Sequence, residues 1–149
     1  MIHKSYLVEE NFENIKNNLI LFYGENLGLM DDFKNKIFDI NARHQILRFS
    51  QDDIFKNLDI FIQEIKNVSL FNDKKIFLIN NVNDKILKVI QEIIPDINEN
   101  KFFLFAEILD KKSKLRNFFE KEKKTDIIPC YEDNYLSIKN IIKKKLKDY

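Results

Sequence analysis

Four short segments of the sequence are dominated by consecutive apolar side chains, and they limit the folds that the chain can adopt. They span residues 19–23, 75–80, 101–106 and 125–129. A strand with one face in water alternates apolar and polar side chains, whereas a strand covered on both faces is a continuous apolar run. A fifth segment, 44–49, alternates more and suits the edge of a sheet. We therefore predict a parallel sheet with helices on both sides.

The segments between these runs have the apolar spacing of amphipathic helices. The longest is 52–68, with Asp52 as its N-cap and with apolar residues on one broad stripe: Ile54, Phe55, Leu58, Phe61, Ile62, Ile65 and Val68. Further helices are predicted over 29–40, over 83–94 before Pro95, and over 111–121 after the capping residue Asp110. Strand and helix alternate five times, so the predicted fold is a doubly wound α/β domain.

The pattern changes after Pro129. Residues 132–147 form one more predicted amphipathic helix, with most lysines on its outer face and with an inner stripe of Ile138, Ile141, Ile142 and Leu146. No further strand follows this helix. We therefore expect an α/β domain over 1–130 and the beginning of a second domain over 131–149, whose remainder the chain lacks.

Charge and cysteine content restrict the classes of function. The chain has 25 Lys and Arg residues against 24 Asp and Glu residues, so its net charge of +1 gives the whole surface no electrostatic preference for nucleic acid or membranes. The single cysteine, Cys130, allows neither an internal disulfide nor a cysteine zinc cluster, which favours a reducing, cytoplasmic setting. No apolar run approaches the roughly 18 residues that span a bilayer, and the first residues do not form a secretory signal.

The remaining reactive side chains do not form a recognisable site. His3 and His44 have no partner pattern for a metal or a nucleophile, and Cys130 follows a buried strand, where an inert apolar role is expected. No metal, no cofactor and no catalytic residue are therefore predicted.

The turn after the first strand is where a nucleotide phosphate would bind, because ligands occupy the carboxyl ends of parallel strands. A phosphate-binding loop reads G-x-x-x-x-G-K-[ST]. Counted from Gly24, the last three of these positions hold Leu29, Met30 and Asp31, so the cation and the hydroxyl are missing and Gly28 is out of place. We interpret this turn as a degenerate loop that does not hydrolyse ATP, with Asp31 and Asp32 as first-turn acids of the next helix.

Residues 67–75, at the end of the longest predicted helix, contain two large apolar side chains that point away from its apolar face. If the helix continued, Leu70 would lie about 60° beyond the edge of the apolar stripe and Phe71 farther round. Packing under a loop and exposure for a partner explain this pair equally well. An exposed pair would be an anchor for a partner protein.

Three stretches resemble one known family, the delta subunit of the bacterial DNA polymerase III clamp loader. They are residues 21–25, 69–79 and 103–115, and their order and spacing match across about residues 4–149. The resemblance implies a RecA-like, AAA-type three-layer fold with a five-stranded, mostly parallel sheet and a phosphate loop that no longer binds nucleotide. It also implies that 132–147 begins a helical lid domain, and that a collar domain is absent here.

The resemblance also implies a site and partners. Leu70 and Phe71 correspond to a hydrophobic wedge that enters a pocket of the sliding clamp, Ser69 matches the residue before them, and Asn72 and Asp73 would lie at the rim. The expected partners are the sliding clamp, which is the beta subunit, and the other clamp-loader subunits. The expected role is to bind the clamp and help open it during DNA replication, without catalysis by this chain, although the family belongs to the DNA polymerase holoenzyme.

Two alternatives stay open at this point. One is a nucleotide-binding enzyme of the same fold class. The other is a module that contacts DNA phosphates through the last helix, whose lysines are Lys139, Lys143, Lys144, Lys145 and Lys147. A solvated helix face is the simpler reading of these lysines.

Overall fold

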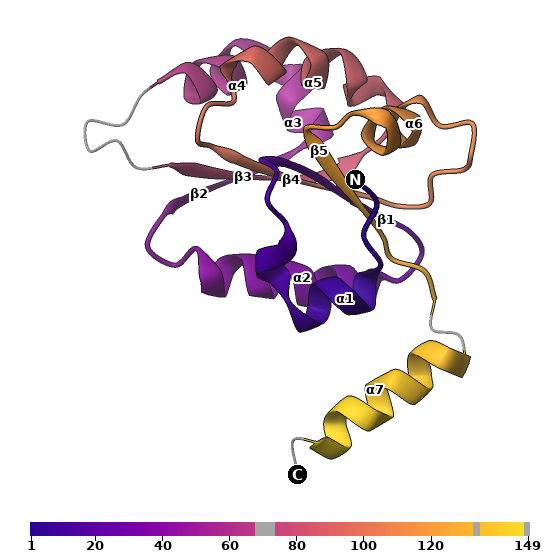
Figure 1. Ribbon diagram of the computed structural model, residues 1–149. Coiled ribbons are helices and arrows are strands. Elements are labelled where there is room, and N and C mark those ends of the chain that lie inside the picture. The colour runs from indigo at the N-terminus through magenta and orange to yellow at the C-terminus, as the bar shows by residue number, and fades with distance from the viewer. Residues whose placement is uncertain (68–73, 133–134, 148–149) are drawn as a thin grey trace.

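The computed structural model describes residues 1–67, 74–132 and 135–147. These residues form a parallel five-stranded sheet in the order β2-β3-β4-β1-β5 (Figure 1). Its strands are β1 (Leu19–Tyr23), β2 (Gln45–Ser50), β3 (Lys75–Val82), β4 (Lys101–Ala106) and β5 (Thr125–Pro129). The five predicted strands are confirmed, with β2 at an edge. β3 continues two residues beyond the predicted end, through an irregularity between Ile79 and Val82.

Two layers of helices cover the sheet, which confirms the predicted three-layer α/β fold (Figure 1). One face carries α1 (Ser5–Glu10) and α2 (Leu27–Ile40). The other face carries α3 (Gln51–Lys56), α4 (Leu58–Lys66), α5 (Leu87–Ile93) and α6 (Lys114–Lys121). Short 3₁₀ turns connect these elements: η1 (Phe12–Asn14), η2 (Asp84–Ile86) and η3 (Ile94–Asp96).

The continuous apolar runs are explained by burial on both faces of the sheet. All residues of β1 are exposed by 2% or less. Leu19, Leu21 and Tyr23 pack toward the α3–α6 layer, whereas Ile20 and Phe22 pack toward α1 and α2. Each face therefore has its own apolar core, and the sheet separates the two.

The predicted single helix over 52–68 is wrong, because the segment forms two helices that meet at Asn57. Asn57 has φ −139° and ψ 59°, which no helix accommodates. The N-cap is Ser50 rather than Asp52, since Ser50 and Asp53 form a reciprocal capping box. The break changes the direction of the stripe, and Phe55, expected inside, is 43% exposed.

Other helix boundaries also differ from the prediction. The helix expected from residue 111 begins at Lys114 and is capped by Ser113, because the Asp110 side chain instead accepts from the Lys112 amide at 2.8 Å. The stretch expected to be one helix over 83–94 is η2, α5 and η3, with Asn83 as the first cap and Pro95 within η3. The sequence does not predict α1, because its apolar residues Tyr6, Leu7 and Val8 are consecutive and do not have the spacing of an amphipathic helix. In the structure only Val8 is buried, whereas Tyr6 and Leu7 are exposed.

The first residues extend the sheet beyond β5. Ile2 forms a parallel bridge to Ile127, the His3 amide donates to the Ile127 carbonyl at 2.9 Å, and the Ile127 amide donates to the Met1 carbonyl at 3.0 Å. This short segment covers part of an edge that would otherwise be open.

The last helix, α7 (Tyr135–Lys147), stands apart from the helix layers (Figure 1). Ile142 and Leu146 were expected to face inward, but they are 53% and 67% exposed, because the described part of the chain places nothing against them. The side chains of Ile138 and Ile141 lie outside the description. No helix among the described residues is long and apolar enough to cross a bilayer.

Replacing Phe77 tests the two-sided core. Phe77 is fully buried and stacks on Phe102 with ring centroids 4.6 Å apart. We expect Phe77→Ala to lower the free energy of unfolding by about 3–5 kcal/mol, from lost burial and a residual cavity. The control Phe55→Ala removes the same atoms from an exposed helix position and should cost about 1 kcal/mol or less. Urea titration followed by circular dichroism measures both, and equal losses would contradict the described core.

Candidate functional site: the turn after β1 and the segment after α4

The turn after β1 is packed directly against the chain that leaves β5. Gly24 has φ +140°, and a Cβ placed there would lie 2.0 Å from the Cys130 carbonyl oxygen. The Cys130 amide donates to the Tyr23 carbonyl at 2.6 Å, and the Asn26 amide donates to the Cys130 carbonyl at 3.1 Å. Only glycine permits this approach of two backbones.

Several backbone amides of this turn donate to acceptors within the protein. The Gly24 amide donates to the Glu107 carbonyl at 3.1 Å, and the amides of Leu29 and Met30 donate to the side chain and the carbonyl of Asn26 at 3.1 and 3.2 Å. A phosphate site at a helix start needs amides that point at the ligand. The turn therefore has the geometry of a structural joint rather than of a phosphate cradle.

The acidic residues near this turn do not lie where the sequence placed them. α2 begins at Leu27 and contains Gly28, so Asp31 and Asp32 belong to its second turn, and the prediction of first-turn acids is wrong. The Asp31 carboxylate lies 3.9 Å from Lys34 Nζ, at the surface. The acid at the helix start is instead Glu25, which accepts from the Glu132 amide at 2.9 Å.

Aromatic residues complete the contact between the turn and the chain after β5. The Tyr23 and Tyr131 hydroxyl oxygens lie 3.0 Å apart, and their rings meet edge to face. Burial, followed by this hydrogen bond, raises the pKa of Tyr23 well above its ordinary value. The Arg116 guanidinium lies over the Tyr23 ring, and its Nε donates to Glu120 at 2.9 Å. Arg116 is thus held by internal partners at this edge of the sheet.

Cys130 and the two histidines lie in surroundings that fit a role in the fold. Cys130 is buried, and desolvation raises the pKa of its thiol to about 12, so the thiol stays protonated at neutral pH. His3 Nε2 lies 2.8 Å from the buried Asp126 carboxylate, a partner that the sequence did not reveal. His44 is half-buried, and its amide donates to the Asn41 carbonyl. Within the described ranges, no group of three or more such side chains is placed to hold a metal ion.

The predicted wedge falls on residues that the structure does not describe. Ser69, Leu70, Phe71, Asn72 and Asp73 all lie in the gap between 67 and 74, so their role stays a prediction.

The residues on either side of this gap are well held. The Asn67 amide donates to the Gln63 carbonyl at 2.8 Å. The buried Lys75 side chain donates to the Glu64 carbonyl at 2.9 Å and lies 3.3 Å from the Glu64 carboxylate, while the Lys75 amide donates to Asn100 at 2.9 Å. The gap therefore lies before the amino end of β3, whereas Gly24 follows the carboxyl end of β1. The two positions are at opposite ends of the parallel strands.

A match to a known protein family covers most of the chain. A family model described as "DNA polymerase III, delta subunit" matches residues 20–131, which include both the turn and the gap. The chain belongs to the DNA polymerase III delta subunit family. The resemblance found in the sequence is thereby confirmed.

Solved structures confirm the fold of this family member. The Bacillus subtilis DNA clamp loader delta protein (YqeN) superposes with a TM-score of 0.67 at 14% sequence identity, over 92% of this chain. The chain spans only 45% of that protein.

A second similarity is to Protein Ycf2 of Physcomitrium patens, 30% identical over 152 aligned residues. These cover 85% of this chain but 7% of Ycf2, so the match carries no argument about function.

The two glycines of the turn provide a matched test. Gly24→Ala forces a Cβ onto a backbone carbonyl and an unfavourable φ, so we expect it to lower the free energy of unfolding by about 3 kcal/mol or more. Gly28→Ala meets nothing closer than 3.7 Å and lies in α2, so it should stabilise by up to about 1 kcal/mol. Thermal and urea unfolding distinguish the two. A stable Gly24→Ala variant would contradict the close contact with Cys130.

Proposed function

We propose that this chain is the part of a clamp-loader delta subunit that binds the sliding DNA clamp and helps to open it during DNA replication, without itself binding or hydrolysing ATP. Leu70 and Phe71 would insert into the clamp, with Ser69, Asn72 and Asp73 at the rim. The observation that carries this proposal is the family match over residues 20–131. The partners would be the clamp and the other loader subunits.

The burial of these two side chains could supply enough free energy for binding to the clamp. Burial of one Leu and one Phe side chain supplies on the order of 3–6 kcal/mol before association costs. The contacts of Lys75 with Glu64 and Asn100 hold one end of the segment, and the helical bond of Asn67 holds the other. Fixed ends reduce the conformational entropy that a short segment loses on binding.

Clamp opening needs no ATP in this chain if its binding favours the open ring. A ligand shifts an equilibrium by the difference between its affinities for the two states. Nucleotide binding by other subunits would then control when the segment after α4 is accessible.

The domain boundary also belongs to this proposal. Residues 1–130 would form the clamp-binding α/β domain, and 131–149 would begin a helical lid. The exposed side chains of Ile142 and Leu146 support this, because such residues pack against further helices when a domain is complete.

The wedge is tested by paired alanine substitutions. We expect Leu70→Ala/Phe71→Ala to weaken binding to the clamp of the same organism at least about 100-fold, as for central anchor residues. The control Phe55→Ala/Ile60→Ala removes an exposed aromatic and an exposed aliphatic side chain from α3 and α4 and should bind normally. Surface plasmon resonance with immobilised clamp measures all three proteins. Normal clamp affinity of Leu70→Ala/Phe71→Ala would contradict the proposal.

ATP independence is tested by restoring the missing loop residues. Leu29→Gly/Met30→Lys/Asp31→Ser recreates the phosphate-loop consensus, and because Met30 is buried, circular dichroism first checks that this variant folds. We expect neither this variant nor the wild type to bind Mg-ATP in isothermal titration calorimetry, because the amides of Gly24 and Asn26 donate to Glu107 and Cys130. Micromolar binding by the wild type would favour the nucleotide-binding alternative. Binding by the triple variant alone would show that side chains, and not the turn geometry, prevent it.

A further inference from the structure

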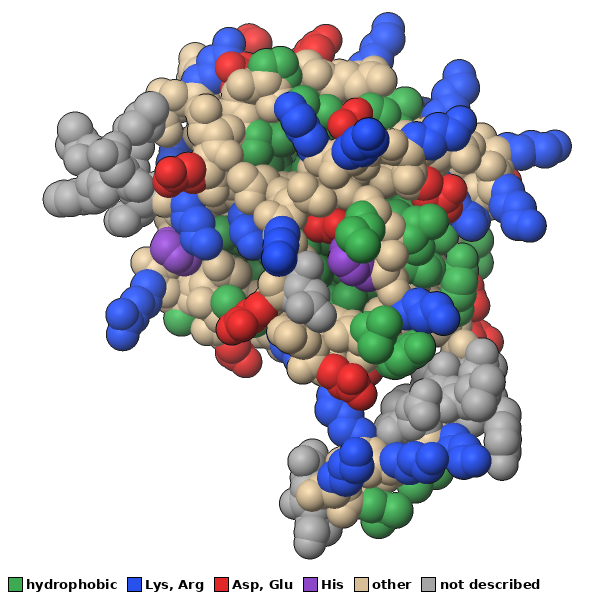
Figure 2. Space-filling view, viewed as in Figure 1, with side chains coloured by type: hydrophobic (Ala, Val, Ile, Leu, Met, Phe, Trp, Pro, Cys, Tyr) green, Lys and Arg blue, Asp and Glu red, His purple; other side chains and the backbone are tan. Residues whose placement is uncertain are grey.

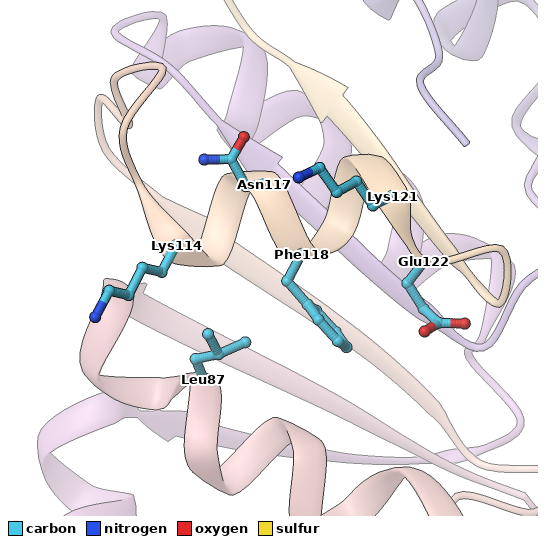
Figure 3. A pocket seen from close by; sticks show the side chains of 6 residues that line it. All are labelled: Leu87, Lys114, Asn117, Phe118, Lys121 and Glu122. Atoms are coloured by element: carbon cyan, nitrogen blue, oxygen red, sulfur yellow. The ribbon is translucent and has the colours of Figure 1, made fainter.

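A groove separates α6 from the η2–α5 stretch on one face of the molecule. It has a volume of about 480 Å³ and is lined by Leu87, Lys114, Asn117, Phe118, Lys121 and Glu122. The side chains of Leu87 and Phe118 lie on either side of it, with Lys114 at one end and Glu122 at the other, and the side chain of Lys121 runs back along α6 toward Asn117 (Figure 3).

The floor of this groove is apolar and accessible. Leu87 and Phe118 both pack against the core below but are only partly buried. The Phe118 ring meets Phe119 edge to face at 5.8 Å, which fixes its position. A slot between an aliphatic and an aromatic side chain suits a large apolar side chain from another molecule.

The walls are held together before any ligand binds. Asp84 in η2 accepts hydrogen bonds from the Ser113 hydroxyl and from the amides of Lys114 and Leu115 at the start of α6. Desolvation opposes ionisation of Asp84, but these bonds outweigh it and lower the pKa of the carboxyl below its ordinary value. A preformed groove spares a ligand the cost of ordering its site.

The surroundings of the groove are strongly basic. Residues 84–92 and 110–124 contain nine Lys and Arg against five Asp and Glu, although the whole chain is nearly neutral. Two of the acids, Asp84 and Glu120, are engaged with the start of α6 and with Arg116. Figure 2 shows basic side chains gathered over this part of the surface. Exposed lysines around the groove are Lys85, Lys88, Lys111, Lys112, Lys114, Lys121, Lys123 and Lys124.

We propose that this groove docks an acidic segment of a partner protein. A large apolar side chain of that segment would insert between Leu87 and Phe118, and flanking carboxylates would pair with Lys114 and Lys121. The apolar slot favours a peptide over nucleic acid, because the phosphates of a nucleic acid gain nothing from the aliphatic side chain of Leu87. The site is independent of Leu70 and Phe71.

The probe is a short fluorescein-labelled peptide of Asp and Glu with Phe and Leu at two central positions. A matched peptide carries Ser at both. Binding to the wild-type chain is followed by fluorescence anisotropy at increasing salt, with oligodeoxythymidine as a competing ligand. We expect the apolar peptide to bind at least about tenfold more tightly than the Ser peptide, and to weaken as salt rises.

Charge reversal identifies the site. Lys114→Glu/Lys121→Glu changes two exposed side chains and should weaken the apolar peptide at least about tenfold. The control Lys56→Glu/Lys66→Glu makes the same charge change on α3 and α4, on the same side of the sheet, and should lose clearly less. Clamp binding should be unchanged in Lys114→Glu/Lys121→Glu, which separates this proposal from the clamp proposal.

Four results would overturn the docking site, and three of them concern the peptides. These three are no peptide binding by the folded wild type, equal binding of the Phe/Leu and Ser peptides, and equal weakening by the two charge reversals. Preferential binding of oligodeoxythymidine that Lys114→Glu/Lys121→Glu abolishes would instead assign the surface to nucleic acid, and would overturn the proposal as well.

Discussion

Burial of both faces of the parallel sheet is the constraint on which the other features of this chain depend. Parallel neighbours need crossover connections, and these place a helix on one face or the other after every strand. All carboxyl ends of the strands therefore lie on one side of the sheet, where Gly24 and Cys130 meet. All amino ends share the other, where Lys75 holds the start of β3. The described residues that flank the gap between 67 and 74 and the turn at Gly24 therefore lie at opposite ends of the strands.

The edge that carries nucleotides in related folds is used here for internal contacts. Amides donate to carbonyls of Glu107 and Cys130, and the buried hydroxyl of Tyr23 pairs with Tyr131. Such a network stabilises one arrangement of the β1 turn and the chain after β5. The backbone at Gly24 and Asn26 is therefore already engaged with Glu107 and Cys130.

The sequence predicted the strands well and the helix ends poorly, for physical reasons. Two-sided burial leaves a continuous apolar run that is visible without a structure, and the alternation in β2 marked its place at an edge. Helix ends depend on which of several neighbouring polar residues finds a backbone amide. Asp52 and Asp110 were reasonable caps by type, but Ser50 and Ser113 hold those positions.

The candidate sites differ in how much of each could be predicted from the sequence. The predicted degenerate phosphate loop rests on Leu29, Met30 and Asp31, which are adjacent in the sequence, whereas the observed contact of Gly24 with Cys130 joins residues more than 100 positions apart and has no local signature. The same is true of His3 and Asp126. Helical spacing marked Leu70 and Phe71 as unusual but did not separate packing from exposure, so only the family resemblance assigned them a role. The groove between α5 and α6 arises from two distant segments and was not predicted.

The joint at Cys130–Glu132 has a mechanical consequence for the helix that follows it. The chain leaves β5 at the rim of the sheet, but the Asn26 side chain, the Glu25 carboxylate and the Tyr23 hydroxyl bind it to the end of β1, which lies between β4 and β5. A load on α7 is thus shared by two strands instead of peeling away one.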